Sequence, residues 1–141
     1  MSYVLHPPKI IKKTSMDDVE TLNSILRALN DAVPKQIEGS LIASTDGFLI
    51  ASTLSEEDAE RVAAMVATTV GVSRRMARIL NAGSLNETAI AGEDRHIRLY
   101  LIDDRGVLAV ITKSESNTAL INLSAREAVR KTADLMDKAS P

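Results

Sequence analysis

The chain has 141 residues, 45% of them hydrophobic, a length and composition that suit a single domain with one core. A net charge of −2, with 26% charged residues of both signs, provides no basic field for nucleic acid, and the lack of cysteine excludes disulfides and thiolate chemistry. The only aromatic residues are Tyr3, Phe48 and Tyr100, too few to favour a site that stacks rings.

The first 14 residues are predicted to form a flexible N-terminal arm. Pro7 and Pro8 are incompatible with a helix interior, and three lysines follow between positions 9 and 13. These lysines come after the first apolar residues, the reverse of a secretory signal, and no apolar run approaches the ~20 residues that span a bilayer. We therefore expect a cytoplasmic protein whose single domain covers residues 15–141.

A first helix is predicted over about residues 16–33. Ser15 and Asp18 have the spacing of a capping box, in which the hydroxyl accepts from a free backbone N–H at the start of the helix. Apolar residues then recur at helical spacing on one face, and Pro34 comes where the helix should stop. These apolar residues are Val19, Leu22, Ile25, Leu26, Leu29 and Val33.

A β-hairpin is predicted over residues 37–52, where two apolar runs are joined by Asp46-Gly47. This dipeptide tolerates the positive φ angles of a tight turn, which explains Asp46 without a catalytic role. Neither run alternates cleanly between polar and apolar residues, so we expect helices to cover both faces of these strands.

The stretch from Ser55 to Asn81 is predicted to be a long helix with two apolar stripes. At about 100° per residue, the first stripe forms an ordinary core face. It comprises Ala59, Val62, Ala63, Val66, Val70, Ala77 and Leu80. The second stripe, roughly 140° away, comprises Met65, Val72, Met76 and Ile79. Between the stripes lie Ala64, Ala67 and Gly71, small residues that would let another backbone come close. Gly71 costs the helix about 1 kcal/mol relative to alanine, which suggests a packing reason for it. We therefore interpret the second stripe as a contact with another chain, most simply a copy of this one.

Three strands and a helix are predicted to complete the domain. Residues 84–91 are predicted to form a polar edge strand, and residues 95–102 a strand in which apolar and polar side chains alternate. Residues 107–112 are predicted to form a central strand buried on both sides, and residues 118–139 the last helix. In the alternating strand, one face should hold His96, Arg98 and Tyr100. The predicted class is therefore α+β, a five-stranded antiparallel sheet with helices on both faces in the order α-β-β-α-β-β-β-α.

This order, the segment from Gly39 to Phe48 and the long Ala-rich helix after it resemble the Roadblock family, which includes dynein light-chain Roadblock and its prokaryotic relatives. The similarity covers about residues 16–139. It implies a Roadblock/profilin-like fold and a homodimer in which the long helices pack across the two-fold axis and the edge strand pairs with its copy. The dimer interface is then expected to include Met65, Thr68, Val72, Met76, Ile79, Asn86, Thr88 and Ile90.

No catalytic, cofactor-binding or metal site is predicted. His6 and His96 are the only histidines, and neither has a further ligand at the spacing of a metal site. Nucleotide-binding and nucleophile motifs are absent from the sequence, and the acids at positions 56–58 suit the first turn of a helix.

The resemblance implies a non-enzymatic regulator or adaptor that binds a small Ras-like GTPase. Candidates for the docking face are Arg61, Arg74, Arg75 and Arg78, since an arginine supplied in trans can stabilise the charge that develops during GTP hydrolysis. The same face could instead hold a switch segment of the GTPase, or the arginines could simply solvate the helix and pair with acids of the dimer mate. Two other functions stay open: a purely structural scaffold, and a ligand sensor of the PAS or GAF kind, for which three aromatic residues supply little.

Overall fold

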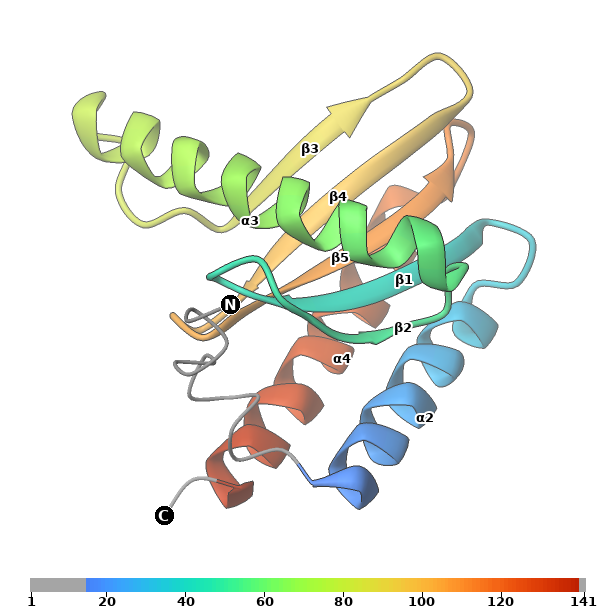
Figure 1. Ribbon diagram of the computed structural model, residues 1–141. Coiled ribbons are helices and arrows are strands. Elements are labelled where there is room, and N and C mark those ends of the chain that lie inside the picture. Colours follow the sequence, from blue (N-terminus) through green and yellow to red (C-terminus); the bar gives the residue numbers. More distant parts are fainter. Residues whose placement is uncertain (1–14, 140–141) are drawn as a thin grey trace.

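The computed structural model describes residues 15–139, which form one sheet and three long helices (Figure 1). In chain order these elements are α2 (Met16–Ala32), β1 (Ile37–Ser44), β2 (Leu49–Ser52), α3 (Glu56–Ile79), β3 (Glu87–Ala91), β4 (Arg95–Ile102), β5 (Gly106–Lys113) and α4 (Thr118–Ala139). The predicted element order and the predicted α+β class are confirmed. The predicted N-terminal arm lies outside the described residues.

The sheet has the strand order β2-β1-β5-β4-β3, and every neighbouring pair is antiparallel. β5 is central, as its continuous apolar run predicts, and its Ala109 lies opposite Leu41 of β1 and Leu99 of β4. β3 is an edge strand, as predicted, but it begins at Glu87 and not at position 84. The difference arises because Leu85 packs against the core on the α3 side before the chain enters the sheet.

Helices cover both faces of the sheet and enclose two cores (Figure 1). On one face α3 packs over side chains that alternate along the strands. This core includes Leu41, Ala43, Ala63, Val66, Val70, Leu99, Val107 and Ala109. On the other face α2 and α4 pack side by side over the remaining strand positions. That core includes Leu22, Leu26, Leu29, Ile42, Tyr100, Ile102, Leu108, Val110, Ile121, Ala125 and Met136. Both faces of β1 and β5 are therefore buried, as their unbroken apolar runs predict.

The helix ends follow the predicted local chemistry. The capping box at α2 is complete: the Ser15 hydroxyl accepts from the Asp18 N–H at 3.1 Å, and the Asp18 carboxylate accepts from the Ser15 N–H at 3.2 Å. After α3, Asn81 takes a left-handed φ of 58°. The prediction that Leu80 belongs to the core stripe was wrong, because α3 ends at Ile79 and Leu80 is 70% exposed.

Candidate functional site: the outer stripe of the long helix and the free edge of the sheet

The outer face of α3 carries the second apolar stripe, and this stripe is exposed. The exposed fractions are 64% for Met65, 53% for Val72, 55% for Met76 and 68% for Ile79. Val66, on the side of the helix toward the sheet, is 4% exposed. The two-stripe pattern is thus a property of α3, and a row of large apolar side chains exposed to water is typical of a contact surface.

Gly71 lies beside this stripe without a packing reason in the described chain. A Cβ built on Gly71 meets no atom within 4 Å, although a glycine inside a helix costs about 1 kcal/mol relative to alanine. Ala64 and Ala67 differ in this respect, because they face the chain's own β1–β2 turn. There, a Cβ built on Gly47 would lie 3.6 Å from Ala64 Cα and 3.7 Å from Ala67 Cβ. Gly71, in contrast, has no neighbour from the described chain at its Cβ position and leaves room for a backbone from outside.

β3 is one of the two edges of the sheet, and three of the predicted interface residues lie in it or just before it. Ile90 is 43% exposed and lies opposite Ile97, which packs against the α3-side core. Thr88 is half-buried, and its hydroxyl finds no hydrogen-bond partner among residues 15–139. Asn86 is exposed and precedes the strand. An edge strand with unpaired backbone groups and an exposed isoleucine is a template for pairing with another strand.

A charged cluster that sequence reasoning missed ties β3 to α4. Glu87, the first residue of β3, lies 3.3 Å from the Arg126 guanidinium of α4 and 4.0 Å from that of Arg98. Arg98 is 8% exposed and donates to the Thr118 hydroxyl at 3.2 Å. Strand alternation correctly placed Arg98 and Tyr100 on one face, but no pattern in the sequence pairs them with a helix 20 or more residues away.

Tyr100 in this cluster gives a pH prediction. Its side chain is buried and its hydroxyl donates to Asn122; burial first, and then the charge of Glu87, raises the pKa of Tyr100 from 10.0 to about 12. The unfolded chain loses this proton near pH 10 while the folded chain keeps it. We therefore expect the free energy of unfolding to fall by ~2–3 kcal/mol as the pH rises from about 10 to about 12. Urea titrations across this range measure the fall, and an equal fall in Tyr100→Phe would contradict its assignment to Tyr100.

The four candidate docking arginines are not equivalent. Arg61 lies 2.7 Å from Asp58, one turn earlier on α3, and Arg74 lies 2.8 Å from Asp104 in the turn between β4 and β5. Within residues 15–139, neither Arg75 nor Arg78 forms an ion pair. Arg78 lines an open polar hollow of about 350 Å³ between the end of α3 and that turn.

Acidic side chains in the described chain do not form a metal site. In the part of the chain that the structure describes, no group of three or more His, Cys, Asp or Glu side chains could hold a metal ion. The acids Glu56, Glu57 and Asp58 lie in the first turn of α3, where the helix dipole favours negative charge. No helix within residues 15–139 combines the length and the apolar composition needed to cross a membrane.

The chain is similar to a known domain family, to two proteins of known sequence and to several solved structures. A model of the Roadblock/LC7 domain matches residues 28–112. Two uncharacterized proteins of Methanocaldococcus jannaschii are each 34% identical over 112 residues, covering 78% of this chain and 95% of theirs. The Roadblock/LC7 domain from Streptomyces avermitilis has a TM-score of 0.75 at 17% identity, covering 79% of this chain and 94% of that one. Myxococcus xanthus MglB has a TM-score of 0.79 at 15% identity, covering 91% and 96%. At these identities the two structures show a shared fold.

Proposed function

The chain belongs to the Roadblock/LC7 family, and on that basis we propose that it is a non-enzymatic, dimeric regulator or adaptor in the cytoplasm that binds a small Ras-like GTPase and modulates its activity or location. The observation that best supports the proposed dimer is the exposed outer stripe of α3. The GTPase is what the likeness to prokaryotic Roadblock proteins implies.

A copy of the chain is the occupant that best fits the outer stripe. Two α3 helices packed across a two-fold axis bury each stripe residue twice, once from each copy. Fully burying a Met, Val or Ile side chain contributes about 1.5–3 kcal/mol. The two copies together contribute eight stripe side chains, and even their half-burial offsets a substantial part of the free-energy cost of association. Pairing of β3 with its copy would at the same time give hydrogen-bond partners to the unpaired backbone groups of this edge strand.

Gly71 supplies a test of this helix packing. Gly71→Ala should stabilise the isolated chain by about 0.5–1 kcal/mol, because alanine favours the helix and its Cβ meets nothing in the described chain. In the dimer the same methyl group lies where two helices approach, so the dimer should dissociate more readily. Denaturation of a monomeric variant and sedimentation of the dimer measure the two effects. A dimer strengthened by Gly71→Ala would show that the helices do not meet there.

The basic end of α3 is the proposed docking face for the GTPase. Arg75 and Arg78 form no ion pair within residues 15–139, whereas Arg74 pairs with Asp104. Such a face can act by inserting an arginine into the nucleotide site or by favouring one arrangement of a switch segment. A structural scaffold is the alternative; it keeps the dimer and needs no GTPase.

Capture of partners tests the GTPase directly. The immobilised protein is exposed to lysate of the cells from which the chain comes, once with a non-hydrolysable GTP analogue and once with GDP, and retained proteins are identified by mass spectrometry. We expect a Ras-like GTPase to be retained in a nucleotide-dependent manner. Stable partners of other kinds, with no GTPase in either state, would favour the scaffold.

A further inference from the structure

The start of α4 lacks the acidic side chains that the other two helices have at the same place. The first turn of α4 contains no acidic residue, whereas α2 begins with Asp17 and Asp18 and α3 with three acids. The cap of α4 is the neutral amide oxygen of Asn117, which accepts from the Leu120 N–H at 3.1 Å. The helix dipole therefore leaves a partial positive charge at this end without a negative side chain in the turn.

Arg98 of β4 brings a buried guanidinium to the same place. Arg98 is 8% exposed, and its Nη2 donates to the Thr118 hydroxyl at 3.2 Å. Its Nη1 lies 4.0 Å from the Glu87 carboxylate, too far for a hydrogen bond, and its buried Nε has no acceptor among residues 15–139. A buried guanidinium with an unpartnered donor is costly, so this arrangement is short of a negative group.

Glu87 does not make up the deficit, because a second guanidinium approaches the same carboxylate. Arg126 of α4 lies 3.3 Å from Glu87 and stands over the Tyr100 ring, 5.6 Å from its centroid. The Tyr100 hydroxyl donates to Asn122 and keeps its proton at neutral pH, since its pKa is raised to about 12. One carboxylate thus serves two guanidinium groups beside the positive end of a helix.

We propose that Thr118 is a phosphorylation site whose phosphoryl group binds to Arg98 and to the start of α4. In this modification a protein kinase transfers the γ-phosphoryl group of ATP to Thr118 Oγ1. The new O–P bond replaces the bond to the β-phosphate oxygen, ADP leaves, and the hydroxyl proton passes to a base of the kinase. A phosphate dianion at this position supplies the missing negative charge and several strong acceptors.

Thr118 is suited to this role by its exposure and by its neighbours. It is an exposed residue, so a kinase can reach it, and its oxygen already lies within hydrogen-bond distance of Arg98. The neighbouring Ser116 differs, because its hydroxyl donates to the carbonyl oxygen of Lys113. The site does not rest on the proposed function, because it involves neither the outer stripe of α3 nor the candidate docking arginines.

Thermal unfolding of the full chain with phosphothreonine encoded at position 118 tests the contact. We expect the phosphoryl group to raise the Tm by roughly 3–6 °C over the unmodified chain, because it gains charge-assisted hydrogen bonds and a favourable dipole. In Arg98→Met most of this rise should disappear, while Arg98→Lys should keep part of it. Each variant is compared with its own unmodified form, which cancels the cost of the substitution itself. Arg27→Met, an exposed change on α2, is the matched control and should keep the full rise.

Mass spectrometry of the protein isolated from its own cells tests whether the modification occurs. Trypsin releases Thr118 in the peptide from Ser114 to Arg126, and fragmentation distinguishes Thr118 from the three serines of that peptide. We expect the phosphate on Thr118. A peptide without phosphate, or with phosphate on the serines alone, would overturn the proposal. A rise in Tm that is undiminished in Arg98→Met would equally overturn it, because the phosphoryl group would then not bind Arg98.

Discussion

Replacing Met65 and Met76 together by glutamate is expected to convert the dimer into monomers. Both side chains are more than half exposed in the single chain, so the substitutions should not disturb its fold. In the proposed dimer each carboxylate would be buried against its own copy, and an uncompensated buried charge costs about 3–5 kcal/mol. The dissociation constant should therefore rise by at least about a hundredfold. Light scattering coupled to size exclusion measures the mass.

The control for this result is Met16→Glu. Met16 is 76% exposed at the start of α2, far along the chain from α3, and a carboxylate in the first turn of a helix is tolerated. Its dimer mass should match that of the wild type. An unaltered dimer in the Met65→Glu, Met76→Glu protein would assign the interface to another surface and refute the proposed role of the outer stripe.

The elements of the fold were predictable because each has a local signal. Ser15 with Asp18 marks the start of α2, Gly47 supplies the positive φ of the hairpin turn, and the unbroken apolar run of β5 marks the centre of the sheet. The errors lie at element ends. Leu80 continues the helical periodicity of the core stripe, but α3 stops one residue earlier, and periodicity carries no information about where a helix ends.

The candidate site was predictable only where it repeats along one element. The outer stripe of α3 follows from spacing within a single helix, so its residues could be identified from the sequence. The Arg74–Asp104 pair joins residues 30 positions apart, and Glu87 contacts Arg126 across 39 positions. Ala64 and Ala67 are small like Gly71, but the sequence does not show that the β1–β2 turn of the same chain lies against them. These contacts depend on how the elements pack, which single-element patterns do not encode.

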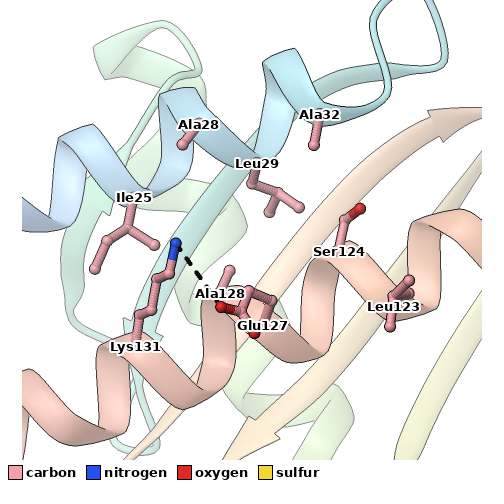
Figure 2. Close-up of a pocket in the computed structure, with 9 residues that line it drawn as sticks. All are labelled: Ile25, Ala28, Leu29, Ala32, Leu123, Ser124, Glu127, Ala128 and Lys131. Carbon is pink, nitrogen blue, oxygen red and sulfur yellow. Dashed lines mark ion pairs between the residues drawn. The ribbon is translucent and has the colours of Figure 1, made fainter.

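A groove of about 310 Å³ between α2 and α4 is a further feature that single-element patterns could not predict. Leu123 lies on the exposed side of α4, and its meaning depends on Ala28 and Ala32, which belong to a helix almost a hundred residues earlier. On each helix alone the pattern indicates one core face and one solvated face. Only their antiparallel packing creates a depression with a projecting leucine beside it (Figure 2).

Reversal of Arg75 and Arg78 to glutamate is expected to weaken binding of the GTPase by at least about tenfold while the dimer stays intact. Both side chains lie on α3 and form no ion pair within the described residues, so their charge is available to acids of a partner. Reversing a charge at an interface replaces an attractive interaction by a repulsive one, so it weakens binding more than removing the charge does. Isothermal titration with the captured GTPase measures the affinity, and the mass of the variant confirms the dimer. Arg27→Glu, an exposed change on α2, is the matched control.

Arg75→Lys and Arg78→Lys then separate the two ways in which this face could act. Lysine keeps the positive charge but lacks the planar, bidentate guanidinium. If the face only tethers the GTPase or holds its switch segment, both lysine variants should bind and act almost as the wild type does. If one arginine enters the nucleotide site, its lysine variant should still bind but lose most of an acceleration that reaches ~10³–10⁵ where such fingers operate. Binding that survives reversal of both charges would place the docking face elsewhere and remove these arginines from the mechanism.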